Sequence, residues 1–172
     1  MKIVITGFSG AGKSTLAKNL GKHYNIPVLH LDAYHFKENW QERDKTEFEQ
    51  IVQDFMKNNE SWIIDGNYRR IATNRFEACD QLFLLYYNRF FCLKSVIKRY
   101  KHYKGKTRPD IADGCEEKID REFLFWVLCK GRTKQRRKQL INRAKSHKCG
   151  LIFKNRKQLF KYYDANNIEY EK

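Results

Sequence analysis

The amino-acid sequence predicts a three-layer α/β/α fold, in which helices cover both faces of a five-stranded parallel sheet. Short apolar runs alternate with segments of helical periodicity through most of the chain, and this alternation is typical of parallel sheets. The 172 residues contain no internal repeat and no linker, so we expect a single domain over residues 1–172. The expected strands are residues 2–6, 28–31, 62–65, 82–86 and 151–153.

The first expected strand leads into a glycine-rich loop. Residues 7–14 have the form G-x-x-x-x-G-K-[ST] of a phosphate-binding P-loop, and residues 13–24 continue with helical spacing. The glycines let backbone N–H groups surround a phosphate, and the helix N-terminus favours an anion. We expect Lys13 to reach the outer phosphates and the Ser14 hydroxyl to ligate Mg²⁺. The expected ATP contacts of this loop are Gly7, Ser9, Gly10, Ala11, Gly12, Lys13, Ser14 and Thr15.

The second and third strands each end in an aspartate, at Asp32 and Asp65. Ligands of open parallel sheets bind beyond the carboxyl ends of the strands, so both carboxylates are expected beside the P-loop. Asp65 is the candidate that holds Mg²⁺ with Ser14, directly or through water, and Asp32 is a candidate catalytic group. The alternative role for each aspartate is to cap the helix that follows it. A helix is expected over residues 46–58.

A candidate lid follows the fourth strand. Residues 90–103 have a helical pattern with a basic outer face, and residues 104–116 combine turn formers with charges. Such a loop closes over ATP, excludes water and delivers a cation to the phosphoryl group. Arg108 is the best candidate for that catalytic cation, because it directly precedes a Pro-Asp pair inside the loop. The remaining expected helices are residues 117–146, with a break near Gly131, and residues 156–165.

The net charge of +15 is unevenly distributed. Residues 1–80 hold eleven basic and eleven acidic residues, whereas residues 81–172 hold twenty-four and nine. Residues 130–148 alone carry nine basic residues and no acidic one. This asymmetry indicates a polyanionic partner, and residues 130–148 are the candidate surface for nucleic acid. The alternative is a solvated basic face that only keeps the protein soluble.

The composition excludes several classes of protein. No apolar stretch approaches the roughly 18 residues of a membrane span, so we expect no membrane partner. The first strand starts almost at the N-terminus, so no signal peptide is expected. The five cysteines are far apart and include no C-x-x-C pair, which favours reduced thiols in the cytoplasm over disulfides or a zinc site.

The chain resembles the adenylate-kinase-like P-loop kinases, and among them most closely the bacterial "DNA topology modulation" proteins. The resemblance implies a P-loop NTPase fold with a five-stranded parallel sheet, a mobile lid at about residues 104–116, and ATP with Mg²⁺ as cofactors. The blocks that carry it are residues 7–14, 30–32 with Trp40, 62–68, 108–110 with 114–116, and 123–126.

The third-strand block is similar to the Asp-Gly-Phe-Pro-Arg motif of adenylate kinases. In this chain the motif reads Asp65, Gly66, Asn67, Tyr68 and Arg69, so the central Phe-Pro is missing. The resemblance implies that Asp65 positions Mg²⁺ and that Arg69 contacts an acceptor phosphate. It also places Gly66 and Asn67 on the substrate side.

The lid motif of the family, Arg-x-Asp, matches Arg108 and Asp110. This match implies an arginine on the transferred phosphoryl group. Arg99 occupies the place of a family arginine near the ATP base, and Arg121 stands where a further arginine follows the lid.

The sequence does not decide the chemical class of the acceptor, because Asp32 and Arg69 favour different classes. Asp32 favours a hydroxyl acceptor, as in sugar, shikimate or nucleoside kinases, because a carboxylate orients a hydroxyl or takes its proton. Arg69 favours a phosphate. The first hypothesis is therefore an ATP-dependent kinase of a nucleotide, nucleoside or small hydroxyl metabolite. The alternative is an ATP-dependent nucleic-acid-binding regulator of DNA topology that acts through residues 130–148.

Overall fold

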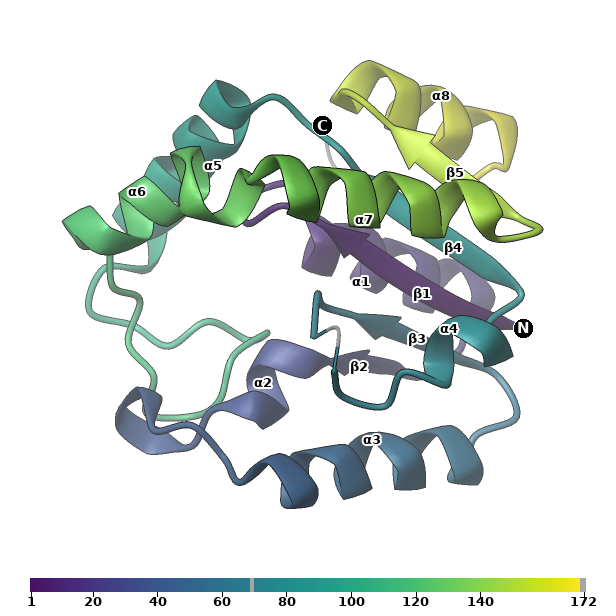
Figure 1. Cartoon of the computed structure of the whole chain (residues 1–172), viewed down its shortest axis with the longest axis horizontal. Helices are drawn as coiled ribbons and strands as arrows, with labels where there is room; N and C mark the ends of the chain where they lie inside the picture. Colours follow the sequence, from purple (N-terminus) through teal and green to yellow (C-terminus); the bar gives the residue numbers. More distant parts are fainter. Residues whose placement is uncertain (69, 171–172) are drawn as a thin grey trace.

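The computed structural model describes residues 1–68 and 70–170. It contains a five-stranded sheet in the order β2-β3-β1-β4-β5, and every neighbouring pair is parallel (Figure 1). The predicted α/β fold with five parallel strands is confirmed. The strands are β1 (Lys2–Gly7), β2 (Val28–His30), β3 (Trp62–Asp65), β4 (Gln81–Leu85) and β5 (Gly150–Phe153).

The central strands form the core. In the sheet register Val4 lies between Ile64 of β3 and Leu82 of β4, and all three side chains are buried. Strands covered by helices on both faces consist of continuous apolar runs, because neither face meets water. This pattern made β1, β3 and β4 recognisable from the sequence. Their parallel register brings their carboxyl ends to the same edge of the sheet.

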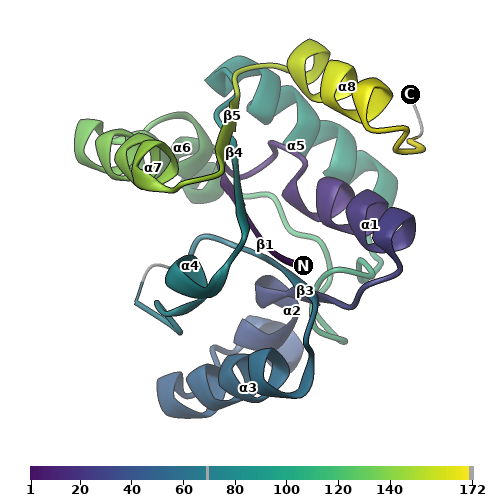
Figure 2. The ribbon, with the colours of Figure 1, turned by 90° about the vertical axis from the view of Figure 1, so that its right-hand side faces the viewer.

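Helices cover both faces of the sheet. In Figure 2, α1 (Lys13–Tyr24), α5 (Arg89–Tyr103) and α8 (Arg156–Ala165) lie on one side. On the other side lie α4 (Arg75–Ala78), α6 (Arg121–Leu128) and α7 (Lys134–Ser146), whereas α3 (Lys45–Asn58) runs along the β2 edge (Figure 1). No membrane-spanning helix is found in the described ranges 1–68 and 70–170.

Local capping sets several helix boundaries. The Asp44 carboxylate accepts hydrogen bonds from the backbone N–H groups of Thr46 and Glu47 at 2.8 and 3.1 Å, which starts α3 where the sequence predicts it. The stretch predicted as helix over residues 117–146 begins only at Arg121, where Asp120 caps α6, and it is interrupted at Gly131, as expected, by the short 3₁₀ helix η2 (Lys130–Arg132). A Cβ at Gly131 would lie 2.8 Å from the Trp126 carbonyl oxygen, so only glycine fits there.

The prediction for the second strand was wrong at its end. β2 stops at His30, and the chain turns directly into the short helix α2 (Leu31–His35). Asp32 therefore lies in the first turn of α2 and not at the end of the strand. Its negative charge interacts favourably with the helix dipole there. The segment that continues through η1 (Glu38–Trp40) to α3 is named the insert, residues 31–44.

Candidate active site

A cavity of about 1110 Å³ opens above the carboxyl ends of the strands. Gly7 and Asp65 end the strands beneath it, Gly66 follows Asp65, and Arg69 lies outside the described residues. The predicted site residues that line the cavity are Ser9, Gly10, Ala11, Gly12, Lys13, Ser14, Thr15, Asp32, Asn67, Arg99 and Arg108.

The P-loop has the close backbone contacts that its glycines predict. Gly10 has φ +77°, and a Cβ there would lie 2.4 Å from the Cys92 carbonyl oxygen of α5. Gly12 has φ +88° and immediately precedes α1, so the N-terminus of that helix opens into the cavity. The Lys13 amine donates to the Phe8 carbonyl oxygen in a long, weak hydrogen bond of 3.4 Å.

A hydrogen-bonded chain runs from the P-loop to β2. The Ser14 hydroxyl donates to Asp65 Oδ2 at 3.1 Å, and Asp65 Oδ1 lies 2.5 Å from His30 Nδ1. Asp65 is only 4% exposed, so its orientation is fixed by these two contacts. His30 gave no functional signal in the sequence because its partner is 35 positions away.

Ser14 and Asp65 fit a magnesium ion. Hydroxyl and carboxylate oxygens are ligands that Mg²⁺ prefers, and its other positions are usually filled by water and substrate phosphates. Within the described part of the chain, no three His, Cys, Asp or Glu side chains gather as a metal site. The Ser14 hydroxyl and the Asp65 carboxylate are therefore two candidate oxygen ligands at this end of the cavity.

Asn67 ties the end of β3 to the P-loop. Its amide oxygen accepts from the Gly7 N–H at 3.1 Å, and its amide nitrogen donates to the Gly7 carbonyl oxygen at 2.5 Å. Gly66 packs against Leu31, where a Cβ would come within 2.8 Å of the Leu31 Cβ. Asn67 therefore holds the chain after β3 against the P-loop, and Gly66 allows the close approach of Leu31. The side chain of Asn67 also lines the cavity.

Asp32 and Tyr68 form a polar pair on the insert side. The Tyr68 hydroxyl donates to Asp32 Oδ1 at 2.8 Å. Burial, followed by the Asp32 charge, raises the pKa of Tyr68, so the phenol keeps the proton that it donates. Phe36 and Trp40 line the cavity beside this pair with their ring centroids 5.2 Å apart.

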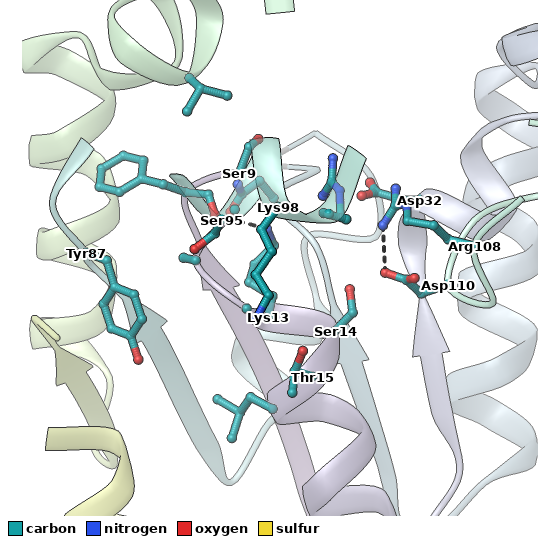
Figure 3. A pocket seen from close by; sticks show the side chains of 18 of the residues that line it. Ser9, Lys13, Ser14, Thr15, Asp32, Tyr87, Ser95, Lys98, Arg108 and Asp110 are labelled. Carbon is teal, nitrogen blue, oxygen red and sulfur yellow. Dashed lines mark hydrogen bonds and ion pairs between the residues drawn. The ribbon is translucent and has the colours of Figure 1, made fainter. Parts of the chain in front are cut away.

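The lid places Arg108 and Asp110 next to the P-loop. Arg108 Nη1 donates to Asp110 Oδ2 at 3.0 Å, and Figure 3 shows both side chains beside Asp32 and above Ser14. Burial alone would raise the pKa of Asp110, but the nearby positive charge of Arg108 outweighs it, so the pKa lies below its ordinary value. The lid is therefore held next to the P-loop.

The lid also contacts the insert. The Trp40 indole N–H donates to the Glu116 carbonyl oxygen at 2.9 Å, and the Asn39 N–H donates to the Gly114 carbonyl oxygen at 3.3 Å. The buried Cys115 thiol donates to the Lys37 carbonyl oxygen at 3.1 Å. These three contacts, named the lid–insert clasp, join the two loops across the mouth of the site.

Arg132 is a site residue that the sequence did not reveal. It lies in η2, is 7% exposed and lines the cavity, with its guanidinium 3.7 Å from the centroid of the Phe8 ring. Its Nε and Nη1 donate to the carbonyl oxygens of Val127 and Tyr87 at 2.9 and 2.8 Å. In the sequence it is one cation among nine, and the helix break at Gly131 is the signal that sets it apart.

The predicted basic surface at residues 130–148 is therefore not one helix, and not all of its cations face solvent. Arg132 lines the cavity. The guanidinium carbon of Arg136 lies 4.3 Å from the centroid of the Trp126 ring, and that of Arg143 lies 4.1 Å from the centroid of the Phe76 ring. Exposed cations within this stretch include Lys134, Arg137, Lys138, Lys145 and Lys148.

With its parallel sheet, its P-loop and the Ser14–Asp65 pair, the chain has the fold of the P-loop nucleoside-triphosphate-binding proteins. Residues 3–75 match the family model "ATPase family associated with various cellular activities (AAA)". No curated protein sequence matches the chain. The sequence comparison thus covers the P-loop part of the chain.

Solved structures share the whole fold at low sequence identity. TT1252 from Thermus thermophilus superposes with a TM-score of 0.56 at 13% identity over 98% of both chains. A shikimate kinase from Bacteroides thetaiotaomicron gives 0.51 at 16% identity over 98% of this chain and 99% of that one. A sugar kinase from Janibacter sp. gives 0.52 at 12% identity over 97% and 94%. The fold is therefore one that P-loop kinases use.

Proposed function

We propose that the protein is an ATP-dependent phosphotransferase that moves the γ-phosphoryl group to a small acceptor, with a hydroxyl acceptor favoured. The observation that carries this proposal is the convergence of Lys13, Arg108 and Asp32 on one cavity. A phosphate-binding loop, a lid cation and an acceptor-side carboxylate are the three parts that phosphoryl transfer to a hydroxyl needs.

The P-loop binds the triphosphate of the donor. Backbone N–H groups of the loop and the start of α1 surround the phosphates, and the Lys13 amine moves from the Phe8 carbonyl oxygen onto them. Ser14 and Asp65 would hold Mg²⁺, which neutralises phosphate charge when bound. Arg108 and Arg132 add two buried cations to the same cavity.

Asp32 is the acceptor-side base. Tyr68 occupies Oδ1 of Asp32, and Oδ2 is thereby oriented for an acceptor hydroxyl. The acceptor oxygen forms a bond to the γ-phosphorus, the bond to the bridging oxygen of ADP breaks, and the hydroxyl proton passes to Asp32. A carboxylate placed here would repel an acceptor phosphate, which is why a hydroxyl is favoured.

The test is an acceptor screen. Phosphorylated product and ADP release are measured with ATP and Mg²⁺ against nucleosides, nucleoside monophosphates, sugars and other small hydroxyl metabolites. An acceptor is expected to raise ADP release in the wild type and not in Lys13→Ala. If no acceptor raises the rate above that of Lys13→Ala, the proposal fails.

A second candidate function is supported by the exposed cations of α7 and the turn after it. Lys134, Arg137 and Lys138 lie on one stretch of this surface without an acidic residue between them. An ATP-dependent nucleic-acid-binding regulator of DNA topology would bind through these cations, with affinity that falls steeply between low and moderate salt. Absence of DNA binding at low salt would rule this candidate out.

A further inference from the structure

Glu117 lies between two site arginines. Its Oε1 is 2.8 Å from Arg99 Nε, and its Oε2 is 2.5 Å from Arg108 Nε. The Glu117 side chain is 1% exposed and that of Arg108 is 8% exposed, so the pair is shielded from water. All three residues line the same cavity as the P-loop.

Arg99 donates its Nε–H to this carboxylate, whereas Arg108 faces it through Nε in a close ion pair without hydrogen-bond geometry. A guanidinium carries one Nε–H and four N–H groups at its two Nη ends. Because Glu117 takes the Nε of each arginine, the Nη ends are left for other acceptors. Arg108 uses Nη1 for Asp110 at 3.0 Å, next to Ser14 and the P-loop. Arg108 thereby presents its Nη end beside the P-loop, and Arg99 lies in the wall of the same cavity.

A shared counter-charge is what keeps the two cations together. Burial, followed by repulsion from Arg108, lowers the pKa of Arg99, whereas Glu117 and, to a smaller extent, Asp110 oppose that shift. Two guanidiniums close enough to repel each other stay in a buried site only when a carboxylate compensates them. No other acidic side chain in the described part of the chain forms an ion pair with Arg99.

The backbone of Glu117 belongs to the base of the lid. Its N–H donates to the Lys106 carbonyl oxygen at 3.2 Å, and it pairs with Lys104 in an isolated β-bridge. The preceding residue, Glu116, receives the indole N–H of Trp40 in the lid–insert clasp. The carboxylate is therefore anchored at the base of the lid.

We propose that Glu117 is a positioning residue that holds Arg99 and Arg108 as one unit for the γ-phosphoryl end of the donor. The proposal rests on the proposed function, and it assigns Arg99 to the phosphates instead of the base. The positioned arginines contact the phosphate that distinguishes ATP from ADP. Loss of Glu117 is therefore expected to affect the two nucleotides unequally.

The test compares nucleotide affinities of Glu117→Gln, which keeps the size of the side chain and removes its charge. Dissociation constants for ADP and for a non-hydrolysable ATP analogue are measured by titration calorimetry with Mg²⁺. We expect about tenfold weaker binding of the ATP analogue and less than about twofold for ADP, as for one charge-assisted contact. Glu116→Gln is the matched control, because it removes an exposed charge from the neighbouring position.

A second variant keeps the proposal testable if Glu117→Gln does not fold. Arg99→Lys retains the charge but lacks the planar fork that presents Nη ends beyond a side-on pair. It is expected to show the same selective loss of the ATP analogue. Equal losses for ADP and the analogue in both variants, or no loss in either, would overturn the positioning role.

The two levels of proposal fail in different ways. A wild type that binds neither nucleotide overturns the proposed function and the role of Glu117 with it. A wild type that binds both nucleotides, with Glu117→Gln and Arg99→Lys behaving like Glu116→Gln, overturns only the role of Glu117.

Discussion

Around the P-loop the chain is held by the sheet, whereas the lid and the insert are held by side chains and by each other. Gly7 ends β1 and is paired through its backbone with Asn67, and Ser14 is hydrogen-bonded to Asp65 at the end of β3. Across the cavity, Arg108 depends on Glu117 and Asp110, and the clasp uses three hydrogen bonds between loops.

In the proposed function this difference separates donor binding from acceptor binding. The donor end is preorganised, because its groups project from buried strands and from the start of a helix. The proposed acceptor end is assembled by contacts between loops, and such segments belong to the low-stability part of a fold. We therefore expect changes at the donor end to abolish nucleotide binding, and changes at the lid and insert to alter turnover and local opening.

The largest effect is expected from Lys13→Ala. Removal of the amine takes away the mobile cation of the donor end, and phosphoryl transfer should fall by about 10³-fold. Steady-state ADP release with the acceptor found in the screen measures this. Lys22→Ala is the control, since Lys22 is an exposed lysine of the same helix that pairs with Glu169. Equal activity of the two variants would contradict the role of Lys13.

A pair of glycine variants compares the two regions directly. Gly10→Ala adds a methyl group 2.4 Å from the Cys92 carbonyl oxygen, and it should cost about 3 kcal/mol of unfolding free energy. Gly105→Ala in the lid has a similar positive φ but open space, and it should cost about 1 kcal/mol. Urea unfolding measures both. A similar cost for the two variants would mean that the P-loop backbone adjusts as freely as the lid.

Asp32→Asn should separate binding from chemistry. We expect turnover to fall by about 10²-fold, because the acceptor loses its base, while affinity for the non-hydrolysable ATP analogue stays unchanged. Tyr68→Phe should give a smaller loss, since it leaves the carboxylate in place and removes only its donor. A parallel loss of nucleotide affinity in Asp32→Asn would show that Asp32 serves the donor end.

Cysteine labelling should sharpen the comparison without a mutation. Cys92 of α5 and Cys115 of the lid are both buried, whereas Cys129 and Cys149 are exposed. At pH 8 a thiol reagent should modify the exposed pair first. It should then modify Cys115 at least about tenfold faster than Cys92, because opening of the lid costs less free energy than global unfolding. Burial raises the pKa of the Cys79 thiol to about 11, so Cys79 should stay protonated and slow at this pH. Equal rates for Cys92 and Cys115 would show that the two regions open together.

The smallest effect is expected from Trp40→Phe. The substitution keeps an aromatic ring and removes the indole N–H that donates to the Glu116 carbonyl oxygen. One hydrogen bond should cost about 1 kcal/mol in urea unfolding, and Cys115 should be labelled faster. Unchanged labelling of Cys115 would show that this bond does not hold the lid.

The donor end could be predicted from the sequence because its determinants are local. Residues 7–14 contain the turn, the phosphate ligands and the helix start in one stretch, and β1 and β3 are continuous apolar runs. Asp65 was identifiable because a buried strand ends at it. Asp32 was placed one element too early, since Leu31 to His35 offer no break between strand and helix.

The rest of the site depends on contacts between distant positions. His30 meets Asp65, Asn67 meets the backbone of Gly7, and Glu117 meets Arg99, and none of these pairs leaves a local pattern. Arg132 was hidden for the same reason, because its inward direction is set by the carbonyl oxygens of Val127 and Tyr87. The periodicity of apolar residues predicts which side chains are buried, but it does not predict which residue faces them across a cavity.

The lid–insert clasp bears on how a protein of this fold acquires a new acceptor. Its acceptor atoms are the backbone carbonyl oxygens of Lys37, Gly114 and Glu116, which every residue type supplies. Side chains such as Phe36 can therefore be exchanged without removing these closing contacts. In the proposed function, evolution or a designer can re-line the acceptor wall at positions such as Phe36, provided that Trp40 and Cys115, whose side chains donate in the clasp, are kept.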